Sequence, residues 1–288
     1  MSGETLRAPR QQLRRLRASA FDLAIDFQGL LKSASIARLS GARRVFGFKR
    51  DALREPASRV LLSKSIPVPA KTHIIRKNLS LLKGSLGIPV PEDARDFVFP
   101  IATSDAHKLE ATAVSAAYAG RYVILNPAGG WPTKLWSAER FGELADHLWT
   151  HFGLQSLVTV GPGEQDLGEK VLQSSRLRKG QVVSPSLKGF YEIAKGAQLY
   201  VGGDTGPTHL AIAAGTPIVG LFGPTEWWRN GSPLPEDICI ERTDIGCRTD
   251  CHRRACSNWI CMDIEVDRVF QAATRRLQVA GNLTPAYT

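Results

Sequence analysis

Short apolar stretches alternate with segments of helical periodicity along most of the chain, and this alternation limits the fold more than any other feature. Strands are predicted at residues 22–27, 44–48, 122–125, 156–160, 181–183, 198–201 and 217–222. Helices are predicted at residues 30–39, 72–86, 137–152, 190–197 and 207–214, and after Gly163. Such strands pair in parallel, so we expect an α/β protein of Rossmann type with ligands beyond the carboxyl ends of the strands.

A linker is predicted within residues 87–100, where a helical pattern stops at Gly87 and is followed by Pro89 and Pro91. A chain of 288 residues is long enough for two domains, each with its own core. We therefore predict a first domain at residues 1–98 and a second at residues 99–288, with the last helix packing back on the first domain.

The formal charge of +10 is concentrated in the first hundred residues. Residues 1–100 hold 19 of the 37 Lys and Arg but 8 of the 27 Asp and Glu, which leaves 18 against 19 in the rest of the chain. A region this basic is either a solvated surface or faces an anionic membrane, an acidic substrate or a nucleic acid. No aromatic-interleaved or helix-turn-helix pattern accompanies it, so we do not expect a nucleic-acid partner.

The sequence contains no candidate transmembrane segment. Its longest uncharged apolar stretch, around residues 211–222, is too short to span a bilayer and is interrupted by Gly215 and Pro217. The Arg-rich first residues lack the apolar centre and cleavage site of a secretory signal. We therefore expect a cytoplasmic protein.

The densest group of reactive side chains lies at the strand-to-helix junction of residues 201–210. Its glycines let the backbone turn close to a ligand, and Pro207 suits the first helical turn, where a missing N–H costs nothing. The remaining N–H groups at such a helix start favour a phosphate. Asp204, Thr205 and His209 can therefore face one ligand, although similar residues also cap helices in proteins that bind nothing there.

Two further glycine-bearing loops follow predicted strands. Residues 126–136 include Lys134, which can neutralise a phosphate, and residues 160–166 include Glu164, which can accept hydrogen bonds from ribose hydroxyls. Loops of this composition are often only structural. Three of them at the strand ends of one sheet nevertheless favour a nucleotide-binding crevice.

Four of the five cysteines, Cys247, Cys251, Cys256 and Cys261, lie within fifteen residues, with His252 beside them. This density suits zinc or an iron–sulfur cluster, but the spacings differ from those of common zinc ribbons. Stable disulfides are disfavoured in the cytosol. We expect a structural segment without metal and keep metal binding as the alternative, which metal analysis of the purified protein decides.

The junction continues as GDTGPTHLAIAAGTPIVGLFGPT at residues 203–225, which resembles the signature of the family 9 glycosyltransferases, the lipopolysaccharide heptosyltransferases. Residues 126–136 look like that family's phosphate-contacting loop, and residues 187–193 look like the segment before its signature strand. Residues 26–33 and 53–58 are similar to the heptosyltransferase I group. The similar segments cover most of the chain from about residue 20.

The resemblance implies the GT-B arrangement, in which two Rossmann-like domains face each other and the second holds most of the ADP-heptose donor. It also implies a Kdo-lipid A acceptor at the inner face of the cytoplasmic membrane, and hence a peripheral protein on an anionic membrane surface. The donor contacts are expected from Thr133, Lys134, Glu164, Asp204, Thr205, Gly206 and His209. The acceptor contacts are expected from Gln28, Lys32 and Arg54.

The implied reaction is one inverting displacement, in which an acceptor hydroxyl attacks the anomeric carbon of heptose and ADP leaves. Lys134 and the N–H groups near residues 205–207 would stabilise the leaving diphosphate, so no cofactor or metal is expected. Lipopolysaccharide biosynthesis is the implied pathway. A different nucleotide sugar remains open as the donor.

The catalytic base is where the sequence departs from the family. Similar enzymes carry an early Ser-x-x-Gly-Asp loop whose Asp is the expected base, whereas this chain begins with an Arg-rich helix. We therefore expect an incomplete amino-terminal domain, from a late start site or a truncated gene. Asp26, at the end of a strand, is the candidate substitute base, although a strand-end Asp is more often a turn or cap residue. The alternative is an inactive remnant that binds the nucleotide sugar without transferring it.

Overall fold

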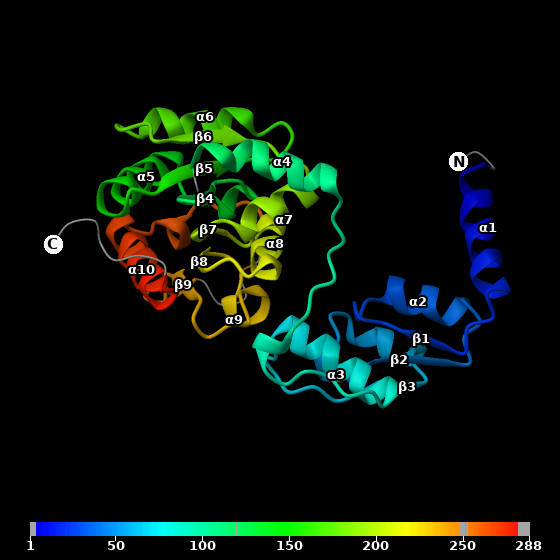
Figure 1. The fold of residues 1–288 in the computed structure, drawn as a ribbon. Helices are drawn as coiled ribbons and strands as arrows, with labels where there is room; N and C mark the ends of the chain where they lie inside the picture. The colour runs from blue at the N-terminus through cyan, green and yellow to red at the C-terminus, as the bar shows by residue number, and fades with distance from the viewer. Residues whose placement is uncertain (1–3, 119, 248–250, 252, 282–288) are drawn as a thin grey trace. The chain divides into compact units, whose positions relative to one another are not determined.

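A computed structural model describes residues 4–118, 120–247, 251 and 253–281 (Figure 1). The chain divides into two compact units, which we call the amino-terminal unit (Met1–Asp96) and the carboxy-terminal unit (Phe97–Thr288). The division falls inside the proline-bearing stretch of residues 87–100. Both units have parallel sheets, as the alternation of strands and helices predicts.

The amino-terminal unit is built on a small parallel sheet. Its strands follow the order β1 (Leu23–Ile25), β2 (Arg44–Phe48) and β3 (Lys64–Ile66). Its helices are α1 (Glu4–Ala18), α2 (Leu31–Leu39) and α3 (Ile74–Leu86). Because α2 packs on β1 and β2 while α3 packs on β2 and β3, one compact core forms around Val45, Phe48 and Leu81.

The carboxy-terminal unit contains a six-stranded parallel sheet, in the order β6-β5-β4-β7-β8-β9. The strands are β4 (Tyr122–Asn126), β5 (Gln155–Thr159), β6 (Gly180–Val183), β7 (Leu199–Gly203), β8 (Ile218–Phe222) and β9 (Ile238–Glu241). From β4 the chain builds outward to β6 on one side and then returns to place β7 on the other. This is the doubly wound Rossmann order, and the reversal lies between β4 and β7.

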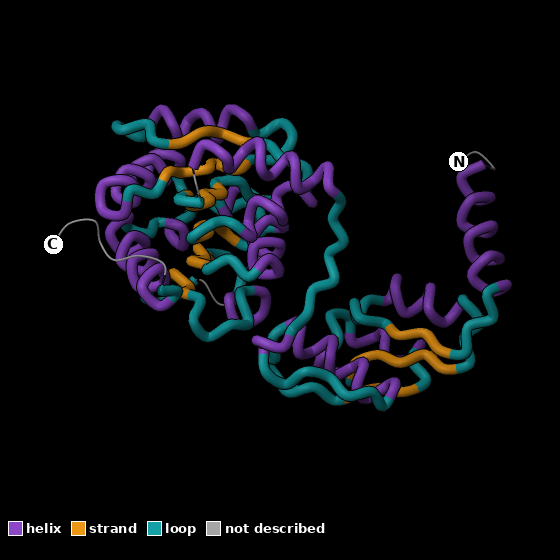
Figure 2. The backbone as a smooth tube through the Cα atoms, viewed as in Figure 1, coloured by secondary structure: helices purple, strands orange, loops and turns teal. Residues whose placement is uncertain are grey.

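Helices cover both faces of this sheet (Figures 1 and 2). They are α4 (Asp105–Ser115), α5 (Ala138–Phe152), α6 (Gln165–Ser174), α7 (Leu187–Lys195), α8 (Gly206–Ala214), α9 (Trp227–Asn230) and α10 (Val266–Val279). Side chains alternate along a strand, so Val123 and Leu125 of β4 pack with α5 and α10, whereas Tyr122 and Ile124 pack with α4, α7 and α8. The sheet is thus buried on both sides.

Local sequence explains where these helices begin and end. The Ser137 hydroxyl accepts the backbone N–H of Arg140 at the start of α5, and Gly153 ends the helix with φ +64°. Helix α7 begins at Leu187, three residues before the predicted start, because the Ser186 hydroxyl accepts the N–H of Gly189.

Strands β3 and β9 and helix α4 lie in segments for which the sequence predicted no element. Strands β3 and β9 are both short edge strands, and short edge strands give little hydrophobic periodicity. The last helix was expected to pack back on the first domain. The buried face of α10 packs against α5, β7, β8 and β9 of the carboxy-terminal unit, and its packing on the first domain stays a prediction.

No helix in the described part of the chain combines the length and the apolar composition needed to cross a membrane.

Candidate functional site

The carboxyl ends of β4 and β7 meet where the strand order reverses. Asn126, the last residue of β4, lies opposite Gly202 of β7, so the loops that follow the two strands start side by side. One loop is residues 126–136 and the other is the short turn into α8. Ligands of doubly wound proteins bind at this edge of the sheet. The topology thus places two of the three predicted loops side by side at one edge of the sheet.

The centre of the site is a largely buried ion pair between these loops. The Lys134 ammonium donates to the Asp204 carboxylate at 2.8 Å and to the Asp204 carbonyl at 2.9 Å. The side chains are 12% and 8% exposed. The Lys134 ammonium also lies 4.4 Å from the centre of the Trp131 ring, which gives a cation–π contact. Three contacts, two with Asp204 and one with Trp131, therefore hold the Lys134 ammonium in place.

Asp204 remains ionised in this environment. Burial raises the pKa of its carboxyl, but hydrogen bonds from His209 and Lys134, with the charge of Lys134, outweigh burial and hold the pKa well below its usual range. His209 Nε2 lies 3.5 Å from the second carboxylate oxygen, and the His209 side chain is 49% exposed. The cluster thus offers a fixed anion, a fixed cation and an imidazole that solvent reaches.

The start of α8 is held by a chain of hydroxyl hydrogen bonds. Tyr200 and Thr208 share one at 2.9 Å, and Thr208 and Thr205 share one at 3.1 Å. The Thr208 hydroxyl also donates to the Gly203 carbonyl, and the Thr205 hydroxyl reaches the Asn126 side chain at 3.5 Å. This network ties the helix start to both central strands.

Gly206 leaves the first turn of α8 open to a ligand. It is exposed, and a Cβ atom built on it meets nothing within 4 Å. The first N–H groups of a helix have no partner within the helix, and together with the helix dipole they favour an anion. The open turn, the adjacent Thr205 and the Lys134 ammonium form one candidate anion site.

Two of the predicted donor residues are already engaged within the protein. The Thr133 side chain is buried, and its hydroxyl donates to the Arg253 carbonyl at 2.6 Å, which speaks against a donor contact through that hydroxyl. One Glu164 carboxylate oxygen accepts the Gly161 N–H at 2.8 Å and so closes the turn that precedes α6. The other oxygen remains the candidate for ribose contact.

The predicted acceptor residues come together in the amino-terminal unit. Gln28, Lys32 and Arg54 are all exposed. Their two segments are joined because the Glu55 N–H donates to the Gly29 carbonyl at 2.9 Å and the Glu55 carboxylate accepts the N–H at the start of α2 at 2.6 Å. Glu55 is therefore a positioning residue that sequence reasoning missed. It joins the two segments that carry the three side chains.

Asp26, the predicted substitute base, shapes this same turn. It is 3% exposed, and one of its carboxylate oxygens accepts the N–H groups of Gln28 and Gly29 at 3.0 and 3.2 Å. Its other oxygen is buried without a hydrogen-bond partner among the described residues. Asp26 thus acts as a turn residue, and its burial in this conformation does not favour contact with an acceptor hydroxyl.

Three side chains near the edge between β4 and β7 were absent from the predicted site, namely Asn126, Trp131 and Thr208. Asn126 was detectable, because a polar residue that ends a buried central strand lies at the ligand edge. Trp131 and Thr208 act through packing and hydrogen bonds that no spacing rule specifies.

No three His, Cys, Asp or Glu side chains in the described parts of the chain are already gathered as metal ligands. His252, named with the cysteines from the sequence, lies outside the described residues.

Comparisons with known proteins agree with this geometry. Residues 10–259 match the family described as glycosyltransferase family 9 (heptosyltransferase). The chain is 30% identical over 240 residues to lipopolysaccharide heptosyltransferase 1 of Pseudomonas aeruginosa. This match covers 80% of this chain and 64% of that protein. It is 26% identical over 239 residues to lipopolysaccharide heptosyltransferase 3 of Escherichia coli, covering 78% and 65%. The chain thus spans less than two thirds of the length of these relatives.

Solved structures with low identity share the fold. E. coli heptosyltransferase WaaC with ADP is 22% identical, with a TM-score of 0.68 over 94% of this chain and 78% of that one. A family 9 glycosyl transferase from Veillonella parvula is 20% identical, with a TM-score of 0.73 over 93% and 77%. The predicted fold class, α/β with Rossmann-like domains of the GT-B type, is confirmed.

Proposed function

Because the chain belongs to glycosyltransferase family 9, the heptosyltransferase family, we propose that it transfers heptose from ADP-heptose to the Kdo-lipid A inner core of lipopolysaccharide. Two relatives named as lipopolysaccharide heptosyltransferases support this reaction class. Solved relatives with ADP and with an ADP-heptose analogue support the donor class. The roles of individual residues below follow from their positions in this structure.

The observation that carries the proposal is the Lys134–Asp204 pair at the edge between β4 and β7. We place the donor diphosphate against the open first turn of α8, where N–H groups favour an anion. Lys134 lies beside this turn and supplies a positive charge as ADP leaves. An ammonium fixed in advance stabilises developing charge without reorganising during the reaction, so the proposed transfer needs no metal.

Asp204 has a different role, because a carboxylate only accepts hydrogen bonds and repels a phosphate. We assign it to donor hydroxyls, either of the heptose or of the ribose, and to holding Lys134. His209, which is half exposed beside it, can contact the same sugar. Glu164 follows the neighbouring strand β5, and we assign its second carboxylate oxygen to the ribose.

In the proposed reaction the acceptor oxygen attacks the anomeric carbon from the face opposite the diphosphate. The bond from carbon to the phosphate oxygen breaks, ADP carries away the electron pair, and the configuration inverts. The hydroxyl proton passes to a base. Asp26 is the candidate in this chain, since a hydroxyl that reached its buried oxygen would supply the hydrogen bond that this oxygen lacks among the described residues.

The amino-terminal unit is assigned to the acceptor. Its exposed Gln28, Lys32 and Arg54 suit the phosphates and carboxylates of Kdo-lipid A. The excess of basic residues in the first hundred positions suits an anionic membrane surface. We therefore propose a peripheral location at the inner face of the cytoplasmic membrane.

The test is turnover. The purified chain is incubated with ADP-heptose, with and without Kdo-lipid A, and ADP release is measured. The proposal predicts ADP release that depends on the acceptor and that Lys134→Met abolishes. Lys195→Met is the control and should leave release intact, because Lys195 is exposed on α7 and pairs with Glu192. If Asp26 is the base, Asp26→Asn also abolishes release while donor binding persists.

The second candidate is a remnant that binds the nucleotide sugar without transferring it. The burial of Asp26 favours this reading. It predicts donor binding without acceptor-dependent ADP release. Release by the chain as given contradicts it.

A further inference from the structure

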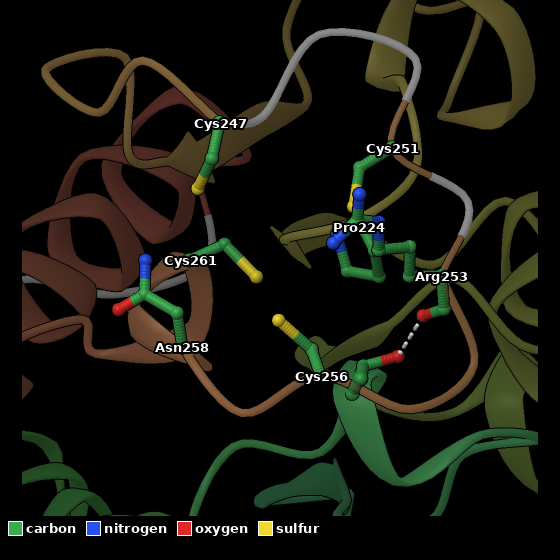
Figure 3. A pocket seen from close by; sticks show the side chains of 8 residues that line it. Pro224, Cys247, Cys251, Arg253, Cys256, Asn258 and Cys261 are labelled. Carbon is green, nitrogen blue, oxygen red and sulfur yellow. Dashed lines mark hydrogen bonds between the residues drawn. The ribbon is translucent and has the colours of Figure 1, made fainter.

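Four cysteine side chains surround one small cavity in the carboxy-terminal unit (Figure 3). Cys256 and Cys261 turn their sulfurs toward each other, whereas Cys247 and Cys251 lie apart from this pair and from each other. The cavity has a volume of about 20 Å³, enough for one particle of about the size of water. Its remaining lining residues are Thr133, Pro224, Arg253 and Asn258.

We propose that Cys247, Cys251, Cys256 and Cys261 form a binding site for one zinc ion. Four thiolates around one ion are one of the tetrahedral ligand sets of structural zinc, with Zn–S distances of about 2.3 Å. The described side chains are not yet gathered at ligand spacing, so the thiols line the cavity without closing on its centre. Binding of the ion requires the four sulfurs to move toward it.

The charge around the cavity suits such a centre. Four thiolates and one zinc ion carry a net charge of −2. Arg253 lines the cavity, and its positive charge partly offsets the negative charge of such a centre.

The segment that carries the cysteines is fastened to the loop that carries Lys134. The Thr133 hydroxyl donates to the Arg253 carbonyl at 2.6 Å, and Trp259 Nε1 donates to the Thr133 carbonyl at 3.0 Å. Cys256 lies between Arg253 and Trp259 in the sequence, and Cys261 lies two residues after Trp259. The zinc ion therefore has a structural role. It holds this segment against the turn that positions Lys134, and it takes no part in the proposed transfer.

The first experiment measures metal by mass spectrometry in the full chain, purified without chelating resin after expression with zinc. We expect about one zinc per chain, the content of a single four-thiolate site. The Cys256→Ser protein should lose most or all of this zinc. Cys239→Ser is the matched control, because Cys239 lies on β9 and does not line the cavity. This variant should retain the zinc ion. Zinc that is absent from the wild type, or retained by Cys256→Ser, overturns the proposal.

The second experiment needs no variant and so does not depend on how Cys256→Ser folds. A mercurial reagent is titrated into the wild-type protein while a metal-sensitive dye records released zinc. Release that is complete only after four thiols react supports the four-cysteine site. Cysteines found paired as disulfides, or zinc released independently of thiol modification, overturns it. Neither readout uses sugar transfer, so failure here leaves the proposed function standing.

Discussion

The two units solve the problem of placing a ligand in different ways. In the carboxy-terminal unit the strand order reverses between β4 and β7, and the loops at that point bring Lys134 to Asp204. In the amino-terminal unit the described strands follow chain order, and polar residues gather instead at the end of β1 around Asp26. Topology thus brings Lys134 and Asp204 together, whereas the other group depends on local turns.

The units also differ in how their charges are arranged. Lys134 and Asp204 are buried and paired, so their geometry is set before binding. Lys32 and Arg54 are exposed and belong to a region with a large excess of positive charge. Buried pairs act at short range, whereas exposed charges act over a Debye length and weaken with salt. We therefore expect specificity from the carboxy-terminal unit and general attraction from the amino-terminal one.

Core substitutions give the largest expected effects. Leu148 and Leu81 are both fully buried, the first in the extensive core of the carboxy-terminal unit and the second in the small core of the amino-terminal unit. Truncation of either to Ala should cost about 2–5 kcal/mol in the unit that contains it. Calorimetry should show each variant lowering a different transition. One common transition lowered by both variants would show that the cores are not independent.

The next largest expected effect is on the free energy of unfolding, measured as a function of pH. The pKa of Asp204 is lowered in the folded state, so its contribution is present above the usual Asp pKa of about 4 and is lost as the pH falls below that value. Asp204→Asn strands Lys134 and should cost about 3 kcal/mol near neutral pH. We expect the gap between the unfolding free energies of wild type and variant to narrow below a pH of about 4. A gap that is constant with pH contradicts the lowered pKa.

Membrane attraction gives the smallest effect per residue. Lys32→Gln and Arg54→Gln should each weaken binding to anionic vesicles by up to about fivefold, equivalent to about 1 kcal/mol. Lys170→Gln and Lys188→Gln are matched controls, because both residues are exposed in the near-neutral carboxy-terminal unit. Vesicle flotation at two salt concentrations measures the effect. Equal losses in both sets would contradict the assignment of the membrane surface to the amino-terminal unit.

Most of the sheet framework was predictable because parallel strands buried on both faces read as apolar runs. The strand at residues 44–48 was predicted with its observed bounds, and those of β4 and β7 lay close to theirs. The edge strand β9 was missed. Its four residues are Ile, Cys, Ile and Glu, so Cys239 and Glu241 leave no apolar run long enough to predict a strand.

The candidate site at the edge between β4 and β7 was predictable only in part. Glycines and Pro207 marked the turn into α8, and Lys134 was recognisable as the cation of its loop. The engagement of Thr133 with Arg253 was not, because it joins residues 120 positions apart. Burial of Asp26 likewise depends on tertiary packing that a single sequence does not encode locally.

The central claim is that the edge between β4 and β7 holds the nucleotide-sugar donor. Calorimetric titration of the full chain with ADP-heptose tests it most directly, comparing wild type with Lys134→Met, Lys134→Arg and the control Lys195→Met. We predict a loss of affinity of about 10- to 100-fold for Lys134→Met, part of which Lys134→Arg restores, and no change for Lys195→Met. Equal affinity in wild type and a folded Lys134→Met protein would contradict the account.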